Sequence, residues 1–244
     1  MSRAAPSAAV NADPLGSPMW AMHAARLFGT APVRFDGAVR VAMPMIAENQ
    51  HVFPLTVDAR ALGTVQRIIV LADLNPIPVA VDFAPMALAP WLALRIKLDQ
   101  RTPVRAAALG ADGVWHVAGG WVDAAGGGCS APPVSRARGD WAEHLGELRG
   151  AAFAHADGTR LKFTVRHPMD TGLVENIPAY NIEEITVRAG GRLLAQMAVQ
   201  GSVAEDPVFS LLLQGPASAP FALRLRDSNG RVFAGDVPPP AGGH

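Results

Sequence analysis

The single cysteine, Cys129, is the residue of this sequence best suited to chemistry. It follows Gly126, Gly127 and Gly128, and the segment Ser130-Ala131-Pro132-Pro133 comes next. The glycines remove side-chain bulk and give the backbone wide freedom, whereas the prolines stiffen the exit. Such a thiol suits a chain that must present a group inside the active site of another protein. Because no base lies beside it in the sequence, we predict an accessible thiol without strong activation. On composition alone, a passive cysteine in a flexible linker fits equally well.

The other polar side chains form no catalytic or metal-binding pattern. The seven histidines show no ligand spacing such as HxxxH, and neither a GxSxG motif nor a phosphate-binding loop occurs. Glu183 and Glu184 are adjacent, so on a strand we expect them on opposite faces, which is wrong for an acid/base pair. We therefore expect no enzyme activity from this chain alone, no cofactor and no metal.

The composition narrows the class of protein. The chain has 244 residues, of which 50% are hydrophobic and 17% are charged, so it can bury a core. Lys+Arg and Asp+Glu are balanced at 21 each, and only 6% of the residues are aromatic. A nucleic-acid partner is therefore not expected. No apolar run reaches the roughly 18 residues of a membrane helix, so we expect no membrane span.

The hydrophobic pattern predicts a short helix followed by many strands. Residues 15–28 have helical spacing, with Gly29 as the stop. From residue 33 onward, short segments alternate apolar and polar residues, with turn signals every 8–12 residues. Residues 91–99 place leucines and an isoleucine on one face, so Arg95 and Lys97 are expected to face outward. Hairpin turns are predicted at Asp112-Gly113 and at residues 227–230.

These patterns predict an all-β protein made of two β-sandwich domains. The first domain is expected over residues 15–123 and the second over residues 151–238. Residues 124–150 concentrate Gly, Ala, Ser and Pro and are expected to form a linker that carries Cys129, with a turn or two of helix near residues 140–150.

Several segments resemble two families of the bacterial Sox sulfur-oxidation system. Residues 45–59, 75–83 and 92–107, with the Gly-Gly-Cys at 127–129, are similar to SoxY, the sulfur-substrate carrier subunit. Residues 165–172, 205–210 and 227–230 are similar to its partner, SoxZ. The whole pattern resembles fused SoxYZ-like carriers encoded beside quinoprotein dehydrogenases that depend on pyrroloquinoline quinone (PQQ).

The resemblance implies immunoglobulin-like and fibronectin-like domains that pack on each other. It also implies that Cys129 holds the cargo covalently on a mobile arm formed by Gly126, Gly127, Gly128 and Ser130. The implied partners are Sox-type cytochromes and hydrolases, or a PQQ-dependent dehydrogenase. The implied location is the periplasm, although no signal peptide is visible, and residues 2–18 would then be a trimmed mature start.

This sequence departs from the SoxY pattern after the cysteine. SoxY ends almost at its cysteine with Gly-Gly, whereas here Ser130, two prolines and a second domain follow. An arm that is tethered at both ends has the reach of a loop rather than of a free tail. Asn49-Gln50 also replaces the usual Asn-Gly. We therefore leave the cargo open as a sulfur-containing or other thiol-reactive group.

Two functions remain open at this point. In the first, the protein is a covalent carrier that uses Cys129. In the second, it is a non-covalent adaptor or binding module for a quinoprotein dehydrogenase or its cytochrome. The loop with His167, Pro168, Met169 and Asp170 is predicted as a domain-interface or partner-docking loop, or else as a structural turn. An exposed Cys129 would also form a disulfide-linked dimer.

Overall fold

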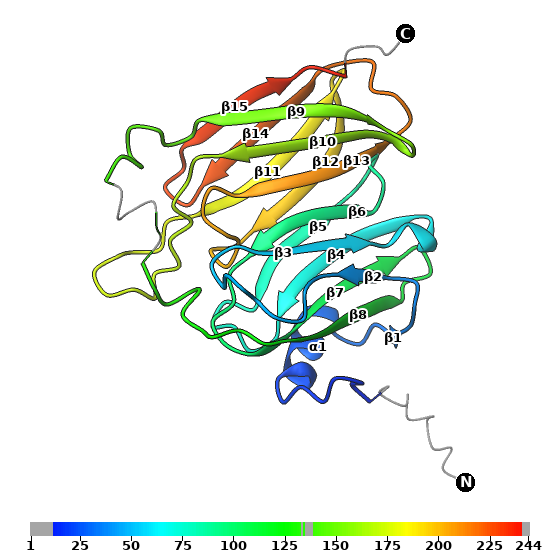
Figure 1. The fold of residues 1–244 in the computed structure, drawn as a ribbon. Helices are drawn as coiled ribbons and strands as arrows, with labels where there is room; N and C mark the ends of the chain where they lie inside the picture. Colours follow the sequence, from blue (N-terminus) through cyan, green and yellow to red (C-terminus); the bar gives the residue numbers. More distant parts are fainter. Residues whose placement is uncertain (1–11, 133, 135–138, 241–244) are drawn as a thin grey trace.

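The structure is a computed structural model that describes residues 12–132, 134 and 139–240. It is built almost entirely of strands in two layered sheets, as predicted (Figure 1). The elements before the cysteine are α1 (Trp20–Phe28), β1 (Val33–Phe35), β2 (Arg40–Ala42), β3 (Phe53–Asp58), η1 (Arg60–Leu62), β4 (Val65–Ala72), β5 (Val79–Ala84), β6 (Trp91–Ile96), β7 (Thr102–Gly110) and β8 (Trp115–Val122). Those after it are β9 (Leu148–His155), β10 (Gly158–Val165), β11 (Ile182–Ala189), β12 (Arg192–Val199), β13 (Val208–Gln214), β14 (Phe221–Asp227) and β15 (Val232–Val237).

Both sheets run without a break from the first domain into the second. The nine-stranded sheet has the order β1-β8-β7-β4-β5-β12-β11-β14-β15, and the six-stranded sheet has the order β2-β3-β6-β13-β10-β9. The domains therefore meet through two antiparallel strand pairs, β5 with β12 and β6 with β13. Val81 pairs with Val199 and Ala93 with Ser210 across this seam. Backbone pairing therefore covers the edges of β5, β6, β12 and β13 at the seam, so these edges are not open to other chains.

One hydrophobic core fills the space between the sheets on both sides of the seam. The alternating pattern of β6 buries Leu92, Leu94 and Ile96, and β10 buries Leu161 and Phe163 in the same cluster. The two predicted hairpin turns are present between β7 and β8 and between β14 and β15. The strand alternation therefore predicted which faces are buried, while the joining of the two cores is a feature of the tertiary structure.

The N-terminal helix covers the outer face of the nine-stranded sheet. It begins at Trp20, later than the predicted start at residue 15, and it stops at Gly29, which has a φ of 60°. Phe28 packs on Trp115 of β8 with a ring-centroid distance of 4.5 Å. Among the described residues, no helix has the length and apolarity that crossing a membrane requires.

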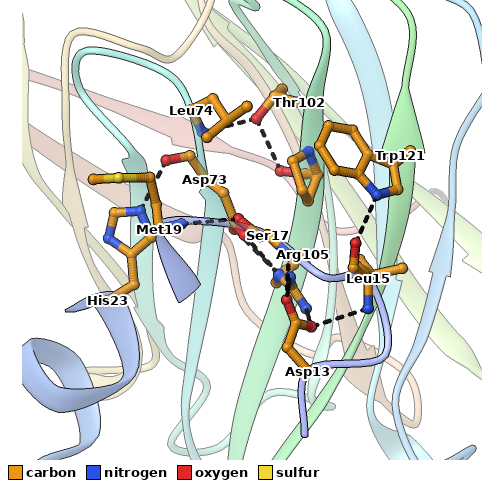
Figure 2. A network of polar contacts seen from close by, with 11 residues as sticks. Asp13, Leu15, Ser17, Met19, His23, Asp73, Leu74, Thr102, Arg105 and Trp121 are labelled. Atoms are coloured by element: carbon orange, nitrogen blue, oxygen red, sulfur yellow. Dashed lines mark hydrogen bonds and ion pairs between the residues drawn. The ribbon is translucent and has the colours of Figure 1, made fainter. Parts of the chain in front are cut away.

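The segment before the helix is anchored by a buried arginine, Arg105 (Figure 2). Its guanidinium group donates two hydrogen bonds to Asp13, at 2.8 and 2.7 Å, and others to Asp73. It also lies 4.3 Å from the centre of the Trp20 ring. Since two carboxylates and an aromatic face surround the guanidinium, its charge is compensated inside the protein. The network fixes residues 13–20 against the sheet.

Two local predictions are wrong. Residues 141–147 form turns rather than a helix, and β9 begins at Leu148. Glu183 and Glu184 do not separate to opposite faces, because both contact Arg226, at 2.7 and 3.4 Å. The β11–β14 register shifts between Ile182 and Glu184, and such an irregularity lets adjacent side chains turn the same way. They form an ion-pair cluster on the sheet.

Candidate functional site

The segment that carries Cys129 leaves the end of β8 and lies against the loop that follows β10. In Figure 1 the green chain after β8 runs close to the yellow-green loop before β11. The contact is specific, because the Thr171 hydroxyl donates a hydrogen bond of 2.7 Å to the carbonyl oxygen of Cys129. The cysteine of the first domain is thus held at the seam by a residue of the second domain.

One carboxylate, Asp99, holds the loop on the side of the first domain. Its Oδ1 accepts hydrogen bonds from the backbone N–H groups of Cys129 and Ser130, each at 3.0 Å, and from the Ser130 hydroxyl at 2.9 Å. The backbone N–H of Gly127 donates to the Asp99 carbonyl oxygen at 3.2 Å. Hydrogen bonds to an ionised acceptor are stronger than those between neutral groups. Asp99 therefore holds residues 126–130, here called the cysteine loop, against the first domain.

The glycines before the cysteine allow this close docking. A Cβ atom on Gly128 would lie closer than 3.0 Å to the carbonyl oxygens of Gln50 and Leu98. Gly126 and Gly127 have φ values of 104° and 84°, which favour glycine. The predicted arm residues therefore serve a defined contact in this conformation.

The expectation of an accessible thiol is wrong for this conformation, because Cys129 is only 1% exposed. Burial raises the pKa of the thiol to about 12, and the nearby Asp99 carboxylate adds to the increase, while Lys97 opposes it. A neutral thiol is a poor nucleophile and a poor partner in disulfide exchange. The docked loop therefore stores Cys129 in an unreactive form. Linkage of two chains through this sulfur requires the loop to leave its position.

Lys97 does not face outward as expected; it is only 4% exposed and reaches into the second domain. Its ammonium group donates hydrogen bonds to the carbonyl oxygens of Met169 and of Gly201, the latter at 2.9 Å. Burial lowers the pKa of Lys97 to about 8, and this decrease is opposed by Cys129 and by the carboxylates Asp170 and Glu205. Lys97 therefore joins the two domains directly beside the cysteine loop.

The loop predicted for interface or docking is buried at the seam. His167, Pro168, Met169 and Asp170 all have buried side chains. The backbone of Asp170 is bonded to Tyr180 in both directions, at 2.7 and 3.0 Å. These residues contact the first domain through Lys97, whereas a role in docking another protein would require exposed side chains.

The cysteine is positioned by three residues that were not predicted from the sequence: Asp99, Thr171 and Lys97. Lys97 carried a signal, because it is one of two lysines and lies beside leucines in an apolar strand. Thr171 lies in the segment 165–172 that resembles SoxZ but was not singled out there, and Asp99 carried no signal. Within the described part of the chain, no group of three or more His, Cys, Asp or Glu residues is arranged to hold a metal ion.

Two protein families match this chain, one before and one after the segment that follows Cys129. Residues 24–129 match the family described as sulfur oxidation protein SoxY, and residues 149–238 match the family described as sulphur oxidation protein SoxZ. The SoxY match ends at Cys129 itself. No curated protein matches the chain.

Three of the solved structures that match this chain are a sulfur carrier protein, a β-glycosidase and a set of fibronectin(III)-like modules. The sulfur carrier protein SoxY from Chlorobium limicola f thiosulfatophilum has 22% identity and a TM-score of 0.39, with 43% of this chain and 96% of that chain covered. A β-glycosidase from Bacteroides vulgatus has 9% identity and a TM-score of 0.25, with 85% and 25% covered. The fibronectin(III)-like modules of Clostridium thermocellum CbhA have 9% identity and a TM-score of 0.21, with 82% and 91% covered.

Proposed function

Because the chain is a fused SoxYZ-like protein, with a SoxY domain and a SoxZ domain in one polypeptide, we propose that it carries an intermediate of sulfur oxidation covalently on Cys129. The cargo is a sulfur-containing or other thiol-reactive group. Partner oxidoreductases act on it while it stays attached. The protein itself supplies the attachment point and presents the cargo, and it is not an enzyme.

The observation that carries this proposal is the way in which the thiol is held. Backbone N–H groups of the loop donate hydrogen bonds to the Asp99 carboxylate, and the Thr171 hydroxyl donates a hydrogen bond to a carbonyl oxygen of the loop. The glycines of the loop allow a close approach to the neighbouring backbone. These contacts are hydrogen bonds of a surface segment rather than strands of the core, so the loop can open locally without unfolding of a domain. A released Cys129 regains water, and its pKa returns toward about 8.5. The thiol is therefore unreactive when docked and reactive when presented.

Loading of the released thiol requires an external electron acceptor. The Cys129 thiol loses its proton, and its sulfur forms a new S–S bond with a reduced sulfur anion. The formation of this bond is a two-electron oxidation. The two electrons pass to a partner oxidoreductase such as a Sox-type cytochrome or a PQQ-dependent dehydrogenase with its cytochrome. A hydrolase partner then removes the oxidised end of the cargo. We place these steps in the periplasm, where the Sox system operates.

A non-covalent adaptor is the second candidate function, and the burial of Cys129 favours it. A thiol that is 1% exposed, with a pKa raised to about 12, contributes no chemistry as long as it stays docked. In that case the protein would recognise a quinoprotein dehydrogenase or its cytochrome through its surface alone.

The deciding experiment is the intact mass of the protein isolated from its own host without reductant. The carrier function predicts an added mass on the peptide that contains Cys129, and this mass disappears after reduction. The Cys129→Ser protein should lack the adduct and all activity that depends on the carrier, while its circular dichroism spectrum stays unchanged. Full activity of the Cys129→Ser protein would exclude the carrier function and leave the adaptor.

A further inference from the structure

The outer face of the six-stranded sheet carries a concentration of positive charge. Five basic residues face outward from β2, β6, β9 and β10: Arg40, Arg95, Arg149, Arg160 and Lys162. Carboxylates near this face are bound by arginines: Asp58 by Arg60 at 2.8 Å, Asp157 also by Arg60, and Glu147 by Arg149 at 3.3 Å. These five basic residues, here called the basic face, come from both domains.

This charge is local, since the whole chain has a formal net charge of zero. On the nine-stranded sheet Arg188 and Arg224 are exposed, but other arginines are paired with carboxylates of neighbouring strands. Arg67 forms an ion pair with Asp82, and Arg226 contacts Glu183 and Glu184. The asymmetry between the two sheets therefore comes from the basic face of the six-stranded sheet. A field of one sign on one face steers and orients an oppositely charged partner.

A groove of about 420 Å³ lies in the middle of the basic face, across the domain seam. Its floor is a row of small residues in register, Thr56, Ala93 and Ser210, and the next residue in that row is Lys162. Arg95 lies at the edge of the groove, and a strand spacing of about 4.8 Å places its Cα roughly 12 Å from that of Lys162. The groove is therefore flanked by one cation from each domain, and no acidic residue lines it.

Aromatic side chains lie beside the charges. The Arg160 guanidinium lies 5.0 Å from the centre of the Trp91 ring, across the seam. Phe153, which pairs in register with Arg160, is 50% exposed. Arginine and large aromatic residues are enriched at the energetic centres of protein–protein interfaces. This combination distinguishes the basic face from a surface that only keeps the protein in solution.

The basic face leads directly to the cysteine loop. Arg95 is two residues before the buried Lys97, and the next residue, Leu98, accepts a hydrogen bond from Gly128 at 3.1 Å. Met43 and Pro44 line the groove, and the chain continues from them to Gln50, whose carbonyl oxygen lies close to Gly128 of the loop. A protein that sits in the groove would therefore lie next to Cys129.

We propose that the basic face is the docking surface for an acidic protein partner, which inserts carboxylate side chains between Arg95 and Lys162. Its position relative to Cys129 rests on the proposed carrier function, whereas the binding itself does not. The fused chain forms this surface because β6 and β13 are paired, so neither domain would provide it alone.

Binding of a fluorescent glutamate-rich peptide, measured by anisotropy with reduced full-length protein, tests the surface directly. We expect the Arg95→Glu/Lys162→Glu protein to bind at least roughly tenfold more weakly than the unmodified protein. The matched control reverses two exposed arginines of the other sheet, Arg188→Glu/Arg224→Glu, and should change binding less than about twofold. Salt of about 1 M, which shortens the screening length to about 3 Å, should abolish binding.

A second probe links the surface to the thiol. The same peptide with an activated disulfide should react with Cys129 roughly tenfold faster than a lysine-rich peptide with the same group, and the advantage should vanish in Arg95→Glu/Lys162→Glu. Equal rates for both peptides would overturn the proposed path to Cys129, while the mass of the loaded protein still tests the carrier function. Equal losses in both double variants, or tighter binding to duplex DNA or to phosphatidylglycerol vesicles than to the peptide, would overturn the assignment to an acidic protein.

Discussion

Replacement of Asp99 by alanine should convert the buried Cys129 into a reactive thiol. The Asp99 carboxylate accepts three hydrogen bonds from the loop, at 3.0, 3.0 and 2.9 Å. If each contributes about 1 kcal/mol after allowance for the partial exposure of Asp99, the variant shifts the balance between docked and released loop by about 3 kcal/mol. A shift of that size corresponds to roughly a hundredfold increase in the released fraction.

The reaction rate with a chromogenic disulfide reagent reports that fraction. The docked thiol is only 1% exposed, so the reagent reaches the sulfur only in molecules whose loop is released. The observed rate is then the released fraction multiplied by the rate of a free thiol, as in hydrogen exchange through local opening. Asp99→Ala should therefore react roughly a hundredfold faster than the unmodified protein, with little change in the melting temperature. The rate should keep rising with pH above the ordinary thiol pKa of about 8.5, because ionisation of the released thiol draws further loops out of the docked state, in which the thiol pKa is about 12.

A matched control is available in the same region. Asp123 is an exposed carboxylate that pairs with Arg101 at 2.6 Å, and its side chain contributes no hydrogen bond to the cysteine loop. Asp123→Ala should leave the reaction rate within about twofold of the original. An unchanged rate in Asp99→Ala, or an equal increase in Asp123→Ala, would refute the conclusion that Asp99 keeps the thiol docked.

Three further outcomes are expected. Gly128→Ala should also release the loop, because its Cβ would contact Gln50 and Leu98, and faster thiol labelling at an unchanged melting temperature is the measurable sign. Asp13→Asn should destabilise the protein by about 1–2 kcal/mol at pH 7. Burial alone would raise the pKa of Asp13, but hydrogen bonds from Arg105 and from backbone N–H groups outweigh burial and hold the pKa below its usual value. The ionised Asp13 stabilises the protein above about pH 4, near the unfolded pKa of about 3.9, and this stabilisation is lost as the pH falls through the folded pKa. The free energies of unfolding of the two proteins, measured in urea, should therefore become equal in acid. Between pH 7 and pH 10 the stability of Cys129→Ser relative to the original protein should rise by up to about 2 kcal/mol, because a thiol whose folded pKa is raised opposes folding once the unfolded thiol ionises. A difference that does not change with pH would contradict the burial of the thiol.

The structure also explains why a carrier would keep both domains in one chain. Lys97 of the first domain is bonded to carbonyl oxygens of the second, and Thr171 of the second domain holds the backbone of Cys129. The site that stores the thiol is therefore built from both domains. Fusion keeps their effective concentration high, so the site stays assembled whether or not the loop is docked.

The local pattern of the sequence was enough to predict the strands, the hairpins and the buried faces. Alternation in β6 and β10 places Leu92, Leu94, Leu161 and Phe163 in the core because side chains of a strand point alternately to its two faces. The glycines before Cys129, and the absence of a second cysteine, also singled out the candidate residue. These features depend on neighbours in the chain, so they can be read from the chain alone.

The environment of the candidate residue was decided by contacts between distant segments. Cys129 is buried rather than exposed because Asp99 and Thr171, 30 and 42 residues away, bind its loop. Lys97 follows an alternating strand yet enters the interior, because the second domain supplies carbonyl oxygens for its ammonium group. Pairing of β5 with β12 and of β6 with β13 brings these groups together. Periodicity reports which face of a strand is apolar, whereas the partner of that strand, and hence the pKa of a thiol beside it, depends on three-dimensional packing.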